Sequence, residues 1–166
     1  MMAEKGYGGN FMWNRKRSVN FSIVVCFIFV AILTAALFIG PFAVKWWFIL
    51  YRGLSETKPA LAEMLTIFKW TFFPSAAFAY IALYSLLKLL FNIKKDRIFI
   101  SQNVTYLRII SWCCFAVAIV TLVGGILYIP YLVIAVAAAF VGLMLRVVKN
   151  VMQNAVEINQ ENELTI

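Results

Sequence analysis

Three long stretches without a charged side chain constrain this sequence more than any other feature. They hold 27, 18 and 37 residues and lie between Arg17 and Lys45, between Lys69 and Lys88, and between Arg108 and Arg146. One helix crosses the bilayer core in about 20 residues. The first two stretches therefore each suit one crossing, and the third is long enough for two crossings joined by a tight turn. These lengths predict an all-α fold, an integral membrane four-helix transmembrane bundle.

The composition excludes several classes of protein. The chain is 64% hydrophobic and 13% charged, whereas soluble domains are about 45–50% apolar and about 25% charged. A soluble enzyme, a nucleic-acid-binding domain and a disordered chain are therefore excluded. The sequence contains no His, which removes histidine-based catalysis and histidine metal ligation.

The charged and polar residues between the stretches divide the chain into segments. We expect a cytosolic leader at residues 1–18, four spans at about 19–44, 66–90, 104–127 and 130–148, and a cytosolic helical tail at 149–166. Ser101 or Asn103 is expected to cap the third helix. Gly124-Gly125 and Pro130 are expected to form the tight turn before the fourth.

The distribution of Lys and Arg predicts the orientation. With both termini in the cytosol, eleven basic residues lie on the inner side and four on the outer side. Cytosolic loops of membrane proteins carry the excess of positive charge. The net charge of +8 is therefore explained by the flanks of membrane spans rather than by nucleic-acid binding.

Few residues could carry chemistry. Cys26, Cys113 and Cys114 lie inside apolar stretches, where small apolar packing is expected and no metal or cofactor site. Ser85 and Lys88 share a helix face, but a lysine near a span end is expected to extend toward the interface instead of activating a serine. No charge is expected at the bilayer midplane, which weakens the hypothesis of an ion-coupled transporter. We therefore predict that the protein is not an enzyme.

Two further patterns concern packing and the outer surface. Small residues recur four positions apart, which allows close helix packing within the bundle or in a dimer: Ala36 and Gly40, Ser75 and Ala79, Ala135 and Ala139, and Ala138 and Gly142. The segment 45–65 mixes Trp and Tyr with charges. An outer aromatic belt with a loop is the favoured interpretation, and a ligand-binding site is the alternative.

Two short blocks are similar to a known family. Phe99, Asn103, Val104, Leu107 and Arg108 match a pattern F-x-x-x-N-V-x-x-L-R before a third span. The ending E-N-E-L-T-I at residues 161–166 resembles an E-N-D-L-T-I end, with Glu163 in place of Asp. Both blocks resemble the YoaS-like proteins, which are small four-span bacterial membrane proteins of unknown function.

The resemblance implies a bacterial plasma membrane, and it implies no enzyme, substrate or cofactor. Family members often lie beside a small helix-turn-helix regulator, so a cytosolic regulatory protein is the expected partner. Direct contact with nucleic acid is not expected, and a homo-oligomer is possible. The leading hypothesis is a membrane sensor or anchor. The candidate partner contacts are Phe99, Asn103, Arg108, Glu161, Asn162, Leu164 and Ile166. The alternatives are an immunity or resistance protein against a membrane-active peptide, and a small transporter or channel subunit.

Overall fold

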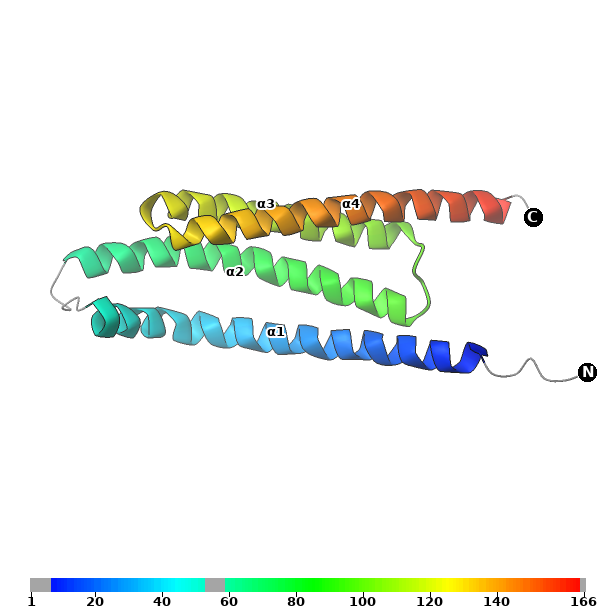
Figure 1. Ribbon diagram of the computed structural model, residues 1–166, viewed down its shortest axis with the longest axis horizontal. Coiled ribbons are helices and arrows are strands. Elements are labelled where there is room, and N and C mark those ends of the chain that lie inside the picture. Colours follow the sequence, from blue (N-terminus) through cyan, green and yellow to red (C-terminus); the bar gives the residue numbers. More distant parts are fainter. Residues whose placement is uncertain (1–6, 53–58, 165–166) are drawn as a thin grey trace, which may run out of the picture.

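Four long helices make up the protein in the computed structural model (Figure 1). The structure describes residues 7–52 and 59–164, with side chains for residues 17–50, 59, 61–126 and 128–161. The helices are α1 (Tyr7–Arg52), α2 (Pro59–Lys94), α3 (Ser101–Leu127) and α4 (Pro130–Leu164). The start of α1, the end of α4 and the loop from α2 to α3 lie together at what we call the terminal end. The turn from α3 to α4 lies at the opposite, distal end.

The helices form because a chain in lipid must satisfy its backbone hydrogen bonds internally. Each helix contains a segment long and apolar enough to cross a membrane: Arg17–Leu50, Leu61–Lys94, Ser101–Ile126 and Pro130–Glu161. The predicted class, an all-α four-helix membrane bundle, is confirmed. The helices continue through Pro41 and Pro74.

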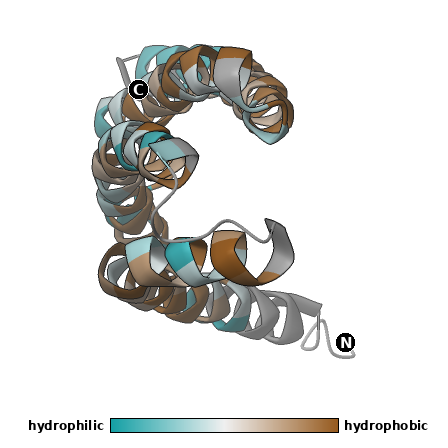
Figure 2. Ribbon diagram, turned by 90° about the vertical axis from the view of Figure 1, so that its left-hand side faces the viewer, coloured by the Kyte–Doolittle hydropathy of each residue, from teal (hydrophilic) through white to brown (hydrophobic). Residues whose placement is uncertain are grey.

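The helices pack in the order of the chain. The packing is most extensive between α3 and α4, less between α2 and α3, and least between α1 and α2. Within the described residues, the backbone of α1 does not come within 8 Å (Cα to Cα) of α3 or α4, and that of α2 does not come within 8 Å of α4. Seen along the long axis, the four helices follow an open arc (Figure 2). The bundle is therefore open on one side rather than closed around a central axis.

The core lies along α3, which packs on both α2 and α4. Its buried side chains include Leu107, Ile110, Cys113 and Ala118, and α4 contributes Ala135. Ser111 Oγ donates a hydrogen bond of 2.8 Å to the carbonyl oxygen of Gly142. Many large apolar side chains point outward instead, as expected for helices that face lipid chains.

The small residues of α1 and α4 lie at helix contacts within the chain. A Cβ added at Gly142 would lie 3.3 Å from Cys114 Cβ, and one at Gly40 would lie 3.6 Å from the Phe72 ring. A small residue lets the neighbouring helix approach closely in lipid. Gly142 therefore allows close packing of α3 and α4, whereas at Gly40 a methyl group would make only an ordinary contact with α2.

Two predictions about helix ends were wrong. The residue that precedes α3 is Ile100, with no side-chain capping bond, so neither Ser101 nor Asn103 is the cap. Gly124-Gly125 lies inside α3, and the turn is formed by Tyr128 and Ile129. The glycines serve packing instead, because a Cβ added at Gly124 would lie 2.8 Å from Thr71 Oγ1.

Candidate functional site

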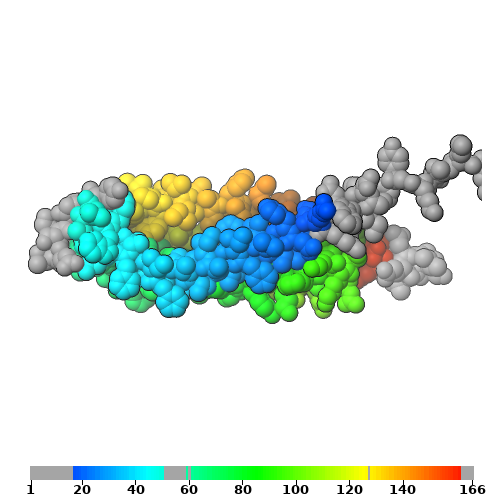
Figure 3. Space-filling model, turned by 90° about the horizontal axis from the view of Figure 1, so that it is seen from below, coloured from blue at the N-terminus to red at the C-terminus, as the bar shows by residue number. Residues whose placement is uncertain are grey.

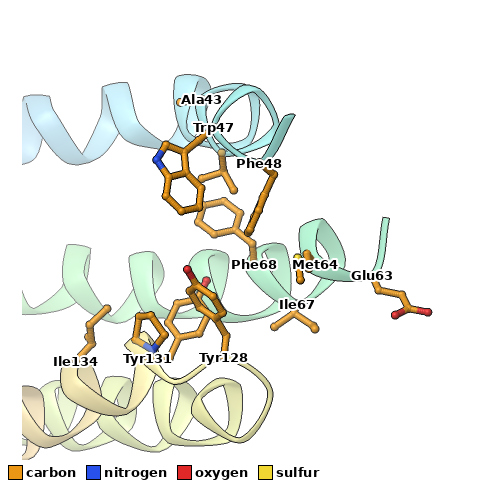
Figure 4. A pocket seen from close by; sticks show the side chains of 12 residues that line it. Ala43, Trp47, Phe48, Glu63, Met64, Ile67, Phe68, Tyr128, Tyr131 and Ile134 are labelled. Carbon is orange, nitrogen blue, oxygen red and sulfur yellow. The ribbon is translucent and has the colours of Figure 1, made fainter. Parts of the chain in front are cut away.

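An apolar pocket opens at the distal end between α1, α2 and the turn from α3 to α4 (Figure 4). Its volume is about 670 Å³. Small-molecule sites in proteins typically measure about 300–1,000 Å³. The lining consists of Ala43, Val44, Trp47, Phe48, Glu63, Met64, Ile67, Phe68, Tyr128, Pro130, Tyr131 and Ile134. We call it the distal pocket.

Aromatic pairs give the pocket its shape. Trp47 and Phe48 on α1 meet edge to face with ring centroids 5.4 Å apart. Phe68 on α2 stacks on Phe72, one turn further along the same helix. The ring centroids of Tyr128 and Tyr131 lie 5.7 Å apart. Bulky rings held against each other leave a space between the helices that they do not fill.

The polar atoms of the pocket are few. The Glu63 carboxylate points away from the cavity, and the Tyr128 and Tyr131 side chains point into it from the turn (Figure 4). The remaining polar group is the Trp47 indole N–H, which is a donor only. The pocket is thus suited to an uncharged, apolar molecule.

A ligand-binding site in the segment 45–65 is the alternative interpretation of the sequence, beside the favoured aromatic belt with a loop. The described parts of this segment, 45–52 and 59–65, are helical, and they contribute Trp47, Phe48, Glu63 and Met64 to the pocket. The signal that was missed is the pair Tyr128 and Tyr131, three residues apart across a turn that faces two aromatic helix ends.

A hydrogen-bonded turn joins α2 and α3 at the terminal end. The Arg97 N–H bonds to the Asn92 carbonyl at 3.0 Å, and the Asp96 N–H bonds to the Ile93 carbonyl at 3.1 Å. Asp96 has a φ of 59°. This pattern is the Schellman motif, with Asp96 where Gly is usual.

Asn103 ties this turn to α3. It is fully buried, at 0% exposure. Its amide accepts a bond of 2.8 Å from Asn92 Nδ2 and donates to the carbonyl oxygens of Arg97 (2.9 Å) and Ile98 (2.8 Å). Asn103 was expected to contact a partner, and that expectation is corrected here, because its side chain is committed to the loop.

The other predicted contact residues are dispersed over the terminal end. Phe99 is 48% exposed, and Arg108 and Glu161 are exposed. Asn162 and Leu164 belong to α4, but their side chains lie outside the described residues, as does all of Ile166. Phe99 lies in the loop that leads into α3 and Asn103 in the first turn of α3, whereas Glu161 lies at the end of α4.

The residues considered for chemistry do not form a reaction centre. Ser85 is buried, and Lys88 Nζ lies 5.5 Å from the centre of the Tyr84 ring. This cation–π contact turns the lysine toward an exposed aromatic ring. Within the part of the chain that the structure describes, no three Cys, Asp or Glu residues gather to hold a metal ion.

The fold defines a multi-pass helical membrane protein. Residues 49–166 match a protein family of unknown function, DUF2975, and the chain belongs to this family. The match covers α2, α3, α4 and the last residues of α1. The resemblance to a family of small four-span membrane proteins is thereby confirmed. The comparisons with curated proteins and with solved structures found no match.

Proposed function

We propose that the protein is a non-enzymatic anchor of a bacterial plasma membrane that holds a cytosolic regulatory protein through the end of α4. Both termini are cytosolic in this proposal, as the basic residues of the terminal end favour. The partner class, a helix-turn-helix regulator, rests on the family resemblance alone.

The length of α4 is the observation that carries the proposal. Its 35 residues extend over about 50 Å, whereas the bilayer core needs about 20 residues. Counted from Pro130, those residues end near Lys149. The remaining part of the helix projects beyond the loop between α2 and α3 at the terminal end (Figure 1).

The projecting part exposes apolar side chains. Val151 is 65% exposed and Ile158 is 59% exposed. Seven residues make nearly two helical turns, so both side chains lie on one face. An apolar face on a helix that leaves the membrane gains stability when a partner protein covers it.

The loop beside α4 supports the same function. Lys94, Lys95 and Arg97 are exposed around the exposed Phe99. The buried Asn103 holds this loop in one conformation. An ordered surface binds a partner at a lower entropic cost than a loose loop does.

The test is capture of the cytosolic partner from native membranes with a photoreactive amino acid at position 151. We expect one regulatory protein, identified by mass spectrometry, to be crosslinked. Deleting residues 159–166, or Ile158→Asn, should abolish its recovery and leave insertion unchanged, because both changes lie beyond the roughly 20 residues after Pro130 that suffice to cross the bilayer core.

The matched control is Gln160→Ala, an exposed change on the opposite face of α4. It should leave recovery unchanged. Equal recovery with the intact protein, the deletion and Ile158→Asn would show that the end of α4 is not the partner-binding element.

A further inference from the structure

We infer that the distal pocket binds an acyl chain of an amphipathic lipid, which enters from the bilayer leaflet at the distal end. The observations that lead to this inference are the depth of the pocket, its open side and the chemistry of its lining. They do not depend on the cytosolic partner proposed above.

The depth of the pocket follows from the lysines of α2. Lys69 and Lys88 are exposed and 19 residues apart, which is about 28 Å along a helix. This distance matches the bilayer core of about 30 Å. Lys69 therefore marks the membrane boundary at the distal end, and the lining residues Ile67 and Phe68 lie directly beside it.

A second marker on α4 agrees. The Arg146 guanidinium lies 5.3 Å from the centre of the Trp112 ring, a pairing typical of the membrane–water interface. Tyr131 is 15 residues earlier, about 22 Å along the helix. Tyr131 and Ile134 thus lie within the region of acyl chains. The pocket reaches from the interface into that region.

The open arc leaves the pocket accessible from the bilayer. Within the described residues no Cα atom of α1 lies within 8 Å of a Cα atom of α4. Seen from the α1 side, the surface around the turn from α3 to α4 stays visible beside α1 (Figure 3). An acyl chain can enter between these two helices without leaving the hydrocarbon.

The lining chemistry selects an acyl chain over a peptide. A peptide brings backbone N–H and C=O groups that need partners, and each unpaired group costs several kcal/mol in lipid. The polar side chains of the lining are few, namely Trp47, Glu63, Tyr128 and Tyr131, so a peptide backbone would find few partners there. The apolar remainder of the lining suits the methylene groups of an acyl chain.

The test uses the full-length protein in vesicles of phosphatidylethanolamine and phosphatidylglycerol. A trace of phosphatidylglycerol carries a diazirine near the end of one acyl chain. After irradiation, mass spectrometry maps the labelled residues. We expect labelling concentrated on the pocket lining, and displacement by excess unlabelled phosphatidylglycerol.

Ile134→Trp fills the pocket from α4, and Ile129→Trp is the matched control, because Ile129 is 78% exposed and outside the lining. We expect pocket labelling to fall roughly tenfold in Ile134→Trp, equivalent to about 1.4 kcal/mol of binding. It should not change in Ile129→Trp. Met64→Trp repeats the test from α2, with thermal stability measured for each variant.

Three outcomes would overturn the inference. Labelling spread evenly over the exposed surface would show ordinary surrounding lipid only. If Ile134→Trp and Met64→Trp both left the labelling unchanged, the acyl chain would bind outside the pocket. Displacement of the probe by an apolar helical peptide would assign the pocket to a protein partner.

Discussion

Two serines in the helix interfaces differ in whether their hydroxyl has a partner. Ser111 Oγ donates across the interface to the Gly142 carbonyl. Ser75 Oγ is buried and has no hydrogen-bond partner among the described residues. A buried unpaired hydroxyl costs free energy, whereas a paired one contributes to stability.

We therefore predict opposite effects of the same substitution. Ser111→Ala should lower the free energy of unfolding by about 0.6 kcal/mol, and at most about 1.7 kcal/mol, as measured for helix–helix bonds in membranes. Ser75→Ala should leave stability unchanged or raise it. Denaturation in mixed detergent measures both, and a larger loss for Ser75→Ala would contradict the bonding described here.

Among the described residues, Asp96 is the non-glycine residue with a positive φ. A φ of 59° lies in the left-handed region, which costs an L-residue about 1–2 kcal/mol. Asp tolerates this region better than most residues, and Gly tolerates it best.

Asp96→Gly should raise the unfolding free energy by up to about 1 kcal/mol, because the strain is larger than the entropic cost of glycine. Asp96→Val should lower stability, since a β-branched residue fits this conformation poorly. Thermal melts of the two variants give the comparison. A lower melting temperature for Asp96→Gly would show that the Asp side chain contributes more than the strain costs.

At the scale of elements, the contact between α2 and α3 depends on a missing side chain. A Cβ at Gly124 would meet Thr71 Oγ1 at 2.8 Å and the Tyr131 ring at 3.3 Å. Thr71 Oγ1 already donates to the Ile67 carbonyl at 2.9 Å. The threonine would lose this bond if it rotated away.

Gly124→Ala is therefore expected to destabilise the protein by about 1–3 kcal/mol, the usual cost of overpacking. Gly40→Ala provides the control, because its Cβ would meet Phe72 at an ordinary 3.6 Å. That change should be neutral or slightly stabilising, since Ala favours helices. Equal melting temperatures for the two variants would contradict close packing at Gly124.

At the scale of the whole molecule, the start of α1, the loop before α3 and the end of α4 share one end (Figure 1). This arrangement requires an even number of crossings. It does not by itself assign that end to the cytosol. The assignment rests on the basic residues, which the cytosolic side of a membrane retains.

We predict that a cysteine at position 95 or 160, in a variant without the native cysteines, is protected from a membrane-impermeant thiol reagent in intact cells. The same cysteine should react after the membrane is permeabilised. Lys95 and Gln160 are exposed, so protection can be attributed to the bilayer. Labelling of intact cells at either position would reverse the orientation.

The number of crossings and their helical form could be predicted from the amino-acid sequence. The reason is that a bilayer demands about 20 apolar residues per crossing and a fully bonded backbone. The uncharged stretches before Lys45 and after Arg108 meet that demand wherever their neighbours lie.

The faces on which the helices meet could not be predicted from the sequence and are seen in the packed structure. Asn103 could be identified as a polar residue near a helix start, but its burial depends on the carbonyls of a turn before α3. Tyr131 and Trp47 lie far apart in the chain and share a pocket because α1 and the turn before α4 both pack beside α2. Apolar residues look alike to lipid on every face of a helix, so hydropathy cannot distinguish a packed face from a lipid-facing one.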